Sequence, residues 1–206
     1  MEEVAEVVRV KPYYSDDLVT IYHGDCREWM PEADVIVTDP PYGTAYETIA
    51  GDDSFPFDLL PGDGACIAFG AARRHVDDLR SFTRPPERVM VWAPAFSWTK
   101  ASDSGVLYKW TPIYCWGIQP TGRGEPAGDV FTDHDAAVSS ISKPVSLMRR
   151  LMPLTVGTIL DPFMGSGSTL VAAKEAGRRA IGIELEERWC ERAAQRCSQE
   201  VLGLVG

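Results

Sequence analysis

Short apolar runs, most of them closed by Gly, Pro or Asp, recur along most of the chain. Within a run the apolar residues are mostly continuous rather than alternating with polar ones, which is typical of strands covered on both faces. The pattern predicts seven strands, at residues 18–23, 33–38, 64–70, 88–93, 112–118, 158–160 and 180–185.

Apolar residues at helical spacing occupy several of the intervals between these runs. Strands that alternate with helices predict an α/β fold with a parallel sheet. Four helices are expected: one over 72–82, one with Pro144 as its first residue and Leu147, Met148 and Leu151 facing the core, one over 170–176 that Gly177 closes, and a last one with the stripe Trp189, Ala193, Cys197 and Val201.

The length of 206 residues and the hydrophobic share of 45% are those of one domain with a sizeable core. We expect a tail over residues 1–12 and a single domain over residues 13–206. Segments 43–62, 95–111 and 119–142 are rich in Gly, Pro, Ser and Thr, and we interpret them as loops on this domain.

The composition indicates a cytoplasmic protein. No apolar run approaches the ~20 residues that span a bilayer. The acidic, valine-rich first ten residues have the wrong chemistry for a signal peptide. The five cysteines include no CxxC pair, and with three scattered histidines they form no zinc pattern. We therefore expect reduced thiols, no bound metal and no membrane contact.

The net charge of −10 argues against a protein that holds nucleic acid by bulk electrostatics. The charge is uneven, however. The first 60 residues hold 14 acidic and 3 basic side chains, whereas residues 61–150 hold 9 acidic and 11 basic side chains. Any polyanion would therefore meet the middle of the chain.

Gly165 and Gly167 follow an apolar strand and open a helix, which permits a tight turn and a close backbone approach to a ligand. The sequence motif of nicotinamide-dinucleotide sites has a third small residue at the position of Leu170, and the lysine of a nucleoside-triphosphate P-loop is absent. Glu184 ends the next strand. Its separation along the sequence from the glycine turn is about that at which an acidic residue contacts ribose hydroxyls in sheets of this type. Together they predict a nucleoside-type cofactor. For the glycines alone, a structural turn near an ordinary surface glutamate is the alternative.

Residues 38–43 read Thr-Asp-Pro-Pro-Tyr-Gly and end a strand. The two prolines stiffen the backbone, so the Asp39 carboxylate and the Pro40 carbonyl become neighbouring acceptors at the carboxyl edge of the sheet. Two acceptors beside the ring of Tyr42 suit a planar substrate that bears an NH2 group. For the two prolines alone, a rigid polar turn is the alternative.

These residues resemble the DNA amino-methyltransferases that use S-adenosylmethionine. The strong matches are residues 38–43 (the DPPY motif) and 161–169 (the DPF-x-GSG-S/T motif), and the weaker ones are 24–26, 142–145 and 182–185. The catalytic motif precedes the cofactor motif, which looks like the permuted β group of the family.

The resemblance implies a Rossmann-like methyltransferase fold: a seven-stranded, mostly parallel sheet with one reversed strand, helices on both faces and a circularly permuted motif order. It implies S-adenosylmethionine as cofactor, and transfer of its methyl group to the exocyclic amine of a base flipped out of double-stranded DNA, with adenine N6 preferred. The implied catalytic residues are Asp39, Pro40, Pro41 and Tyr42, and the implied cofactor-binding residues are Asp25, Lys143, Asp161, Phe163, Gly165, Ser166, Gly167, Ser168, Thr169 and Glu184.

Within that set, the resemblance gives Asp25 the adenine end of the cofactor, Glu184 the ribose and Lys143 the methionine side. Two features depart from the family. A histidine often stands shortly before the Lys-Pro pair, and here the nearest is His134. The only room for target recognition is in loops 95–111 and 119–142.

Candidate DNA contacts in and beside these loops are Trp98, Lys100, Lys109 and Arg123, with solvated loops as the alternative; Tyr114 and Trp116 are interpreted as core residues. A homodimer is expected, because β-group relatives are often dimers and a dimer would join two middle segments.

Three alternatives stay open. Cytosine-N4 methylation of DNA is the nearest, although an initial Ser in place of Asp39 is commoner in that group. Relatives that methylate RNA or protein amides usually begin the motif with Asn and have the unpermuted order. A non-catalytic DNA-binding or partner subunit could retain the fold, but the intact Asp39, Tyr42 and glycine turn argue against it.

Overall fold

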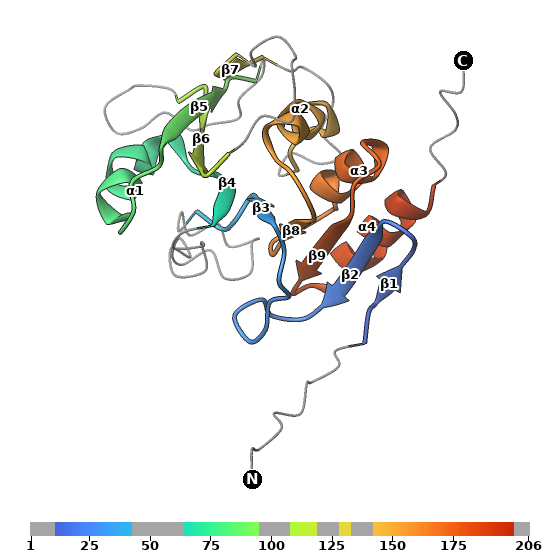
Figure 1. The fold of residues 1–206 in the computed structure, drawn as a ribbon. Coiled ribbons are helices and arrows are strands. Elements are labelled where there is room, and N and C mark those ends of the chain that lie inside the picture. Colours follow the sequence, from blue (N-terminus) through green and yellow to red (C-terminus); the bar gives the residue numbers. More distant parts are fainter. Residues whose placement is uncertain (1–10, 43–63, 95–107, 119–127, 133–141, 200–206) are drawn as a thin grey trace, which may run out of the picture.

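The structure is a computed structural model that describes residues 11–42, 64–94, 108–118, 128–132 and 142–199 (Figure 1). Within them, one sheet has the strand order β1-β2-β9-β8-β3-β4-β6-β5-β7. The strands are β1 Tyr14–Ser15, β2 Val19–His23, β3 Val35–Thr38, β4 Ala65–Phe69, β5 Arg88–Trp92, β6 Thr111–Trp116, β7 Val130–Phe131, β8 Ile159–Asp161 and β9 Ala180–Glu184. The helices are α1 His75–Ser81, α2 Val145–Leu151, α3 Ser168–Glu175 and α4 Glu187–Ser198, with short 3₁₀ helices η2 Ala72–Arg74 and η3 Met152–Leu154.

The sheet is mostly parallel, as predicted. Strands β2, β9, β8, β3 and β4 run in one direction. Strand β6 is antiparallel to both of its neighbours, β4 and β5. The carboxyl ends of the five parallel strands therefore meet at one edge of the sheet, which is where open α/β sheets bind ligands.

The prediction of seven strands with one reversed strand is wrong in number: the described residues form nine strands, and both β1 and β6 are reversed. All seven predicted runs do form strands, each within two residues at its ends. The additional strands, β1 and β7, have two residues each and lie at the two edges of the sheet. Two residues are too few to produce a hydrophobic pattern, so only pairing with a neighbouring strand creates these elements.

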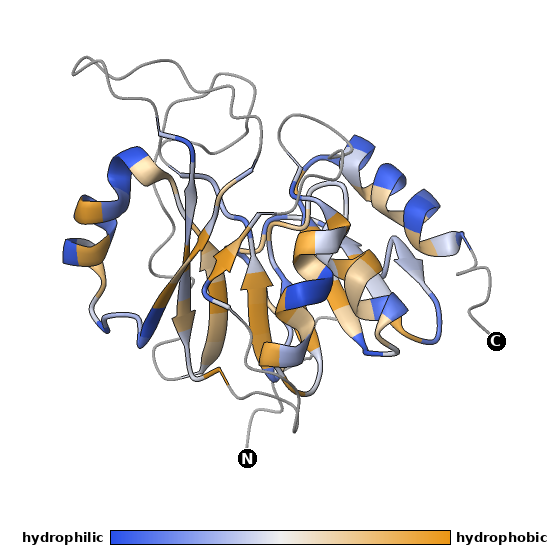
Figure 2. Ribbon diagram, turned by 90° about the horizontal axis from the view of Figure 1, so that it is seen from above, coloured by the Kyte–Doolittle hydropathy of each residue, from blue (hydrophilic) through white to orange (hydrophobic). Residues whose placement is uncertain are grey.

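Helices cover both faces of the sheet, as predicted. Helices α2, α3 and α4 pack on one face, in a core cluster that includes Leu151 and Ala193. Leu79 of α1 packs on the other face, beside Trp116 of β6. Figure 2 shows hydrophobic strands in the middle of the molecule and hydrophilic positions on the outer sides of the helices. This burial on two faces explains why the strand sequences are continuously apolar.

Helix boundaries follow the predicted signals with one correction. Pro144 is not the first residue of α2 but the extended residue before it, with φ −63° and ψ 143°, and α2 begins at Val145. Leu147, Met148 and Leu151 are buried as expected. Gly177 ends α3 with a φ of 67°, a conformation that glycine adopts without strain.

Several predictions fall on residues outside those that the structure describes. They include most of the tail 1–12, Trp98, Lys100, Arg123 and His134 in the candidate recognition loops, and Val201 of the last helical stripe. The single-domain prediction stays a prediction.

All five cysteines are buried free thiols.

Within the described ranges, no helix combines the length and the hydropathy needed to cross a bilayer. The same residues contain no group of three or more His, Cys, Asp or Glu placed to hold a metal ion.

Candidate active site

Four neighbouring parallel strands bring the predicted site residues to one edge of the sheet. Asp25 follows β2, Glu184 ends β9, Asp161 ends β8 and Asp39 follows β3. Two of these residues lie in the first 40 positions and two in the last 50, and the strand order β2-β9-β8-β3 brings the two pairs together at one edge. The predicted catalytic and cofactor motifs therefore lie side by side, on β3 and β8.

A buried hydrogen bond joins the two motifs directly. The Thr38 hydroxyl donates to Asp161 Oδ1 at 2.8 Å, and the Phe163 amide donates to the same oxygen at 3.2 Å. Asp161 is only 2% exposed, and this burial raises the pKa of its carboxyl to about 7, against the hydrogen bonds from Thr169 and Thr38 that favour the charged form. Asp161 thus fixes the turn after β8 to the end of β3.

The glycine turn after β8 has the backbone that its sequence predicted. Gly165 and Gly167 have φ values of 50° and 79°, in the left-handed region that favours glycine. A Cβ on Gly167 would stand 2.8 Å from the Cβ of Ala193, so the turn lies against α4. A Cβ on Gly165 would meet no atom within 4 Å. The turn thus packs on α4 at Gly167 and has open space at Gly165.

Glu184 is held beside this turn. Its two carboxylate oxygens accept hydrogen bonds from the amides of Gly165, at 3.0 Å, and Glu186, at 2.9 Å. Burial raises the pKa of Glu184, while these amide hydrogen bonds oppose that effect. An anchored carboxylate can accept hydrogen bonds from ribose hydroxyls, and the open space at Gly165 leaves room for the rest of such a ligand. The predicted cofactor-binding residues therefore fit a nucleoside-type cofactor.

Asp25 lies in the turn after β2, next to the end of β9, because the Gly24 amide donates to the Glu184 carbonyl oxygen at 2.9 Å. Its carboxylate accepts hydrogen bonds from the side chain and the amide of Arg27, with Nη2–Oδ2 at 2.7 Å. The Arg27 contact lowers the pKa of Asp25. The predicted adenine contact of Asp25 stays a prediction, although the residue lies on the correct edge.

The predicted catalytic residues form a compact charged group with Lys143. The Lys143 ammonium donates to Asp39 Oδ2 at 2.6 Å and to the Tyr42 hydroxyl oxygen at 2.9 Å. The Tyr42 hydroxyl in turn donates to Asp39 Oδ1. Pro40 is buried and Pro41 is half-buried, as expected for a stiff segment that leaves a strand. Lys143 was predicted on the methionine side of the cofactor, and in the structure its ammonium contacts the catalytic residues.

Two contacts at the glycine turn had no signal in the sequence. Arg196 of α4 donates from Nη1 to the carbonyl oxygen of Ser166 at 2.6 Å and to the hydroxyl of Ser166 at 3.0 Å. The hydroxyls of Ser142 and Ser166 are 3.0 Å apart. Ser166 was predicted at the site, but Arg196 lies 30 positions later on an ordinary amphipathic helix, and no motif spacing points to it.

Comparisons with known proteins agree with this geometry. A family model described as DNA methylase (N6_N4_Mtase) matches residues 102–196. YubD of Escherichia coli (strain K12), which is named as a methylase, is 30% identical over 200 residues, which cover 84% of this chain and 87% of YubD.

Two solved methyltransferases share the fold. The crystal structure of M1.HpyAVI covers 88% of this chain and 99% of its own, with 19% identity and a TM-score of 0.67. The same protein has been solved as a complex with S-adenosylmethionine, with 21% identity over 87% of this chain and all of its own, and a TM-score of 0.62. The PvuII DNA methyltransferase, described as cytosine-N4-specific, covers 94% of this chain and 91% of its own, with 15% identity and a TM-score of 0.64.

The neighbours confirm the Rossmann-like methyltransferase fold, and YubD is similar over most of both chains. The chain belongs to the N6/N4 DNA methylase family, the S-adenosylmethionine-dependent amino-methyltransferases of DNA.

Proposed function

We propose that this chain transfers a methyl group from S-adenosylmethionine to the N6 amine of adenine in DNA. One observation carries the proposal: the Asp39 carboxylate and the glycine turn of Gly165 lie on adjacent strand ends, which the Thr38–Asp161 hydrogen bond joins. The carboxylate that would accept a hydrogen bond from an amine is therefore next to the turn that would bind a methyl donor. The initial Asp of the DPPY motif favours adenine over cytosine.

The cofactor, when bound, supplies an electrophilic methyl group on a sulfonium. We assign its ribose to Glu184 and its adenine end to Asp25, and the methionine part to the turn of residues 163–169. Lys143 and Asp161 are the other members of the predicted cofactor set. We assign Asp161 an indirect role, through the turn that it fixes, because its carboxylate is buried and accepts hydrogen bonds from Thr38 and Phe163.

Asp39 and its proline neighbours act on the amine. The lone pair of an adenine amine is delocalised into the ring, which makes the amine a poor nucleophile. When Asp39 and the Pro40 carbonyl accept hydrogen bonds from its two N–H groups, the nitrogen becomes more pyramidal and its lone pair becomes available for attack on a methyl group. Orientation of this kind contributes up to ~7–11 kcal/mol to catalysis.

Asp39 retains the capacity for this role. Each carboxylate oxygen has two lone-pair sites, and the described contacts place one hydrogen bond on each oxygen. The side chain is also 23% exposed, so a substrate can reach it. The Tyr42 ring would stack on the base, which must leave the duplex at a few kcal/mol of unstacking.

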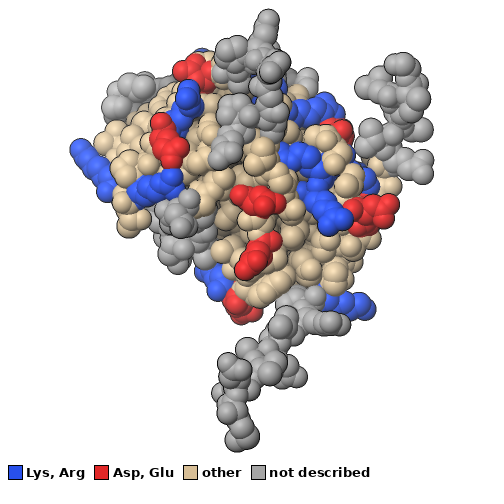
Figure 3. All heavy atoms as spheres, in the orientation of Figure 1, with Lys and Arg blue, Asp and Glu red and all other residues tan. Residues whose placement is uncertain are grey.

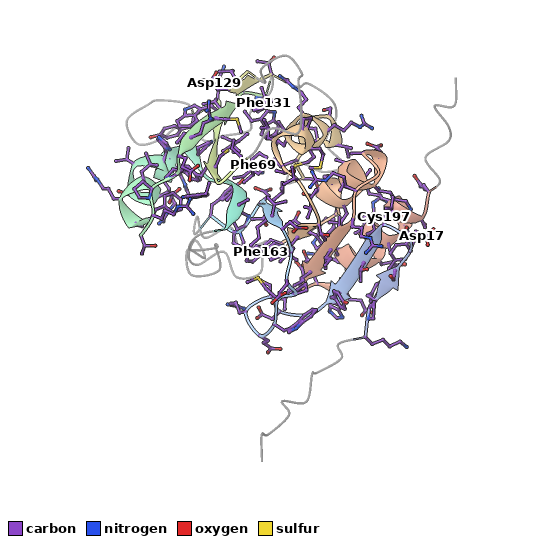
Figure 4. The ribbon with its side chains drawn as sticks, viewed as in Figure 1. Asp17, Phe69, Asp129, Phe131, Phe163 and Cys197 are labelled. Carbon is purple, nitrogen blue, oxygen red and sulfur yellow. The ribbon has the colours of Figure 1, made fainter. Side chains whose placement is uncertain are left out.

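The test is transfer of tritium from labelled S-adenosylmethionine to DNA. We expect transfer by the wild type and a loss of at least about 100-fold in Asp39→Ala, because the variant lacks the carboxylate acceptor. Asp17→Ala is the matched control, since Asp17 is an exposed acid on the β1–β2 turn (Figure 4). Mass analysis of the labelled nucleosides identifies the base. If the labelled product is N4-methylcytosine, the substrate base is cytosine and not adenine. If protein that binds the cofactor transfers no label to any DNA, the proposed activity is excluded.

We further propose that the chain acts as a homodimer. Basic and acidic side chains are interspersed on the face shown in Figure 3, so this face has little net attraction for a polyanion. The excess of basic residues lies in the middle of the sequence, and two copies of that segment would offer DNA twice as many phosphate contacts.

A further inference from the structure

Lys143 is unusually buried for a lysine. Its side chain is 8% exposed, and lysines are almost never this buried unless they are paired. Its ammonium forms an ion pair with Asp39 at 2.6 Å and a hydrogen bond with Tyr42 at 2.9 Å. A buried charge with two polar partners, both in the predicted catalytic motif, indicates a function within that motif.

The neighbouring residue makes the contact with the cofactor turn. The Ser142 hydroxyl lies 3.0 Å from that of Ser166, whereas the Lys143 ammonium contacts Asp39 and Tyr42. The segment that leads into α2 therefore has two separate contacts, one with each motif. Lys143 belongs to the catalytic side of this division.

The contacts fix the orientation of the catalytic carboxylate. Tyr42 donates to Oδ1 of Asp39 and Lys143 donates to Oδ2, so both ends of the carboxylate are held. Lys143 also contacts Tyr42, which closes a ring of three hydrogen bonds. A carboxylate held at both oxygens cannot rotate, and its remaining lone pairs keep fixed directions.

Three aromatic rings surround the ammonium. Its nitrogen lies 5.4 Å from the ring centroid of Tyr42, 5.2 Å from that of Phe69 and 5.8 Å from that of Trp92. Figure 4 shows Phe69 in the interior of the molecule, between β4 and α2. Rings at these distances stabilise a cation and limit its access to water. The position of the ammonium is therefore set by the fold and not by the flexible lysine stem alone.

We propose that Lys143 is a positioning residue for the catalytic carboxylate: its ammonium holds Asp39 in the orientation in which it accepts a hydrogen bond from the amine of the base, and Tyr42 in the orientation in which its ring stacks on that base. The proposal rests on the proposed methyl transfer to DNA. It places Lys143 beside the carboxylate that binds the amine, in contrast to a role in holding the methionine side of the cofactor.

The test separates these two roles by comparing kcat with cofactor affinity. In Lys143→Ala we expect kcat to fall about 100-fold, because small misplacements of a reacting group can reduce rates by that factor. The Kd for S-adenosylmethionine, measured by calorimetry, should stay within about threefold of the wild type. Lys143→Met keeps most of the packing volume and should show the same loss of kcat, which separates the charge from the shape.

Chemical rescue provides a readout that a purely structural role would not give. Ethylammonium or propylammonium ions added to Lys143→Ala can place a cation in the space left by the side chain. We expect them to raise kcat at least about tenfold, whereas a neutral alcohol of similar size should not.

Lys174→Ala is the matched control. Lys174 is also a partly buried lysine in an ion pair, with Asp16 at 2.5 Å, but it lies near the β1 edge of the sheet. This variant should lose stability, and its kcat should neither fall nor respond to alkylammonium.

Three results would overturn the positioning role in a protein whose wild type methylates DNA. They are an unchanged kcat in Lys143→Ala, a cofactor Kd raised tenfold or more, and an absence of rescue by either ammonium ion. Failure of the wild type to methylate DNA would instead remove the proposed function itself.

Discussion

Asp161 combines two features that rarely occur together, an ionisable side chain and almost complete burial. It also links the two motifs through Thr38, so it cannot be replaced by an apolar residue without leaving buried donors unsatisfied. Because burial favours the neutral carboxylic acid, its pKa is raised to about 7. The folded chain therefore binds this proton more tightly than the unfolded chain does.

Asp161→Asn tests this effect on stability. A raised folded pKa stabilises the fold at low pH, and that contribution is lost as the pH rises from about 4 through about 7. Asparagine cannot ionise and keeps an oxygen that can accept from Thr38. The free energy of unfolding of the wild type relative to Asp161→Asn should therefore fall with rising pH, by on the order of 4 kcal/mol. Urea unfolding at several pH values measures it, and parallel pH dependences would contradict the prediction.

A different residue-scale lesson comes from Lys143. The sequence placed it at the site through the Lys-Pro pair, but the contacts of its ammonium depend on how two segments about 100 positions apart meet. Local sequence cannot specify which of two adjacent motifs a long, flexible side chain reaches. Arg196 was missed for the same reason, because its contact with Ser166 depends on how α4 packs against the turn.

At the scale of elements, the turn between β8 and α3 was predicted well because its glycines have a local cause. Two residues with positive φ at the start of a helix are required by the turn itself. The start of α2 was misplaced by one residue, since Pro144 is tolerated both before a helix and at its first position. The edge strands β1 and β7 were missed because their cause is pairing and not composition.

Gly167→Ala tests how tightly the turn packs on α4. Alanine at a φ of 79° has a conformational cost of about 1–2 kcal/mol, and overpacking against Ala193 adds about 1–3 kcal/mol. Gly177→Ala is the matched control, because its φ is 67° but a Cβ there would meet no atom within 4 Å. We expect Gly167→Ala to lower the free energy of unfolding by clearly more than Gly177→Ala, as measured in urea.

Adding Ala193→Gly to Gly167→Ala separates the two contributions. The double variant removes the 2.8 Å contact with the Cβ of Ala193 but keeps the 3.3 Å contact with its Cα and the backbone strain, so the interaction energy of the cycle should show partial recovery. Equal destabilisation by the two single glycine variants would show that α4 moves away at no cost. That result would contradict the prediction that the turn packs tightly against α4.

At the scale of the whole molecule, the strand order is what creates a site. Asp25, Glu184, Asp161 and Asp39 are spread over the chain, and the order β2-β9-β8-β3 makes them neighbours at one edge. The net charge of the whole chain, −10, opposes DNA binding. Binding of the DNA substrate therefore requires additional phosphate contacts.

We propose that homodimer formation provides these additional contacts, and the mass of the particle in solution is the test. Light scattering at the concentration used for activity should give about twice 22.7 kDa. DNA affinity should fall both with salt, because phosphate contacts release counterions, and with dilution of the protein into the monomer range. A particle of 22.7 kDa that methylates DNA at the same concentration would eliminate the dimer.

The sequence by itself determined the seven principal strands, the α/β class, the glycine turn and the acid-proline motif. Each of these has a local physical cause, such as a buried apolar run, a positive φ or a proline-stiffened backbone. Only the tertiary structure decided the strand order, the bond from Thr38 to Asp161 and the partners of Lys143. The bond from Thr38 to Asp161 and the partners of Lys143 join residues more than 100 positions apart, as do the β2–β9 and β3–β8 pairings in the strand order. The packing of the whole sheet selects these contacts, and they leave no periodic trace in the chain.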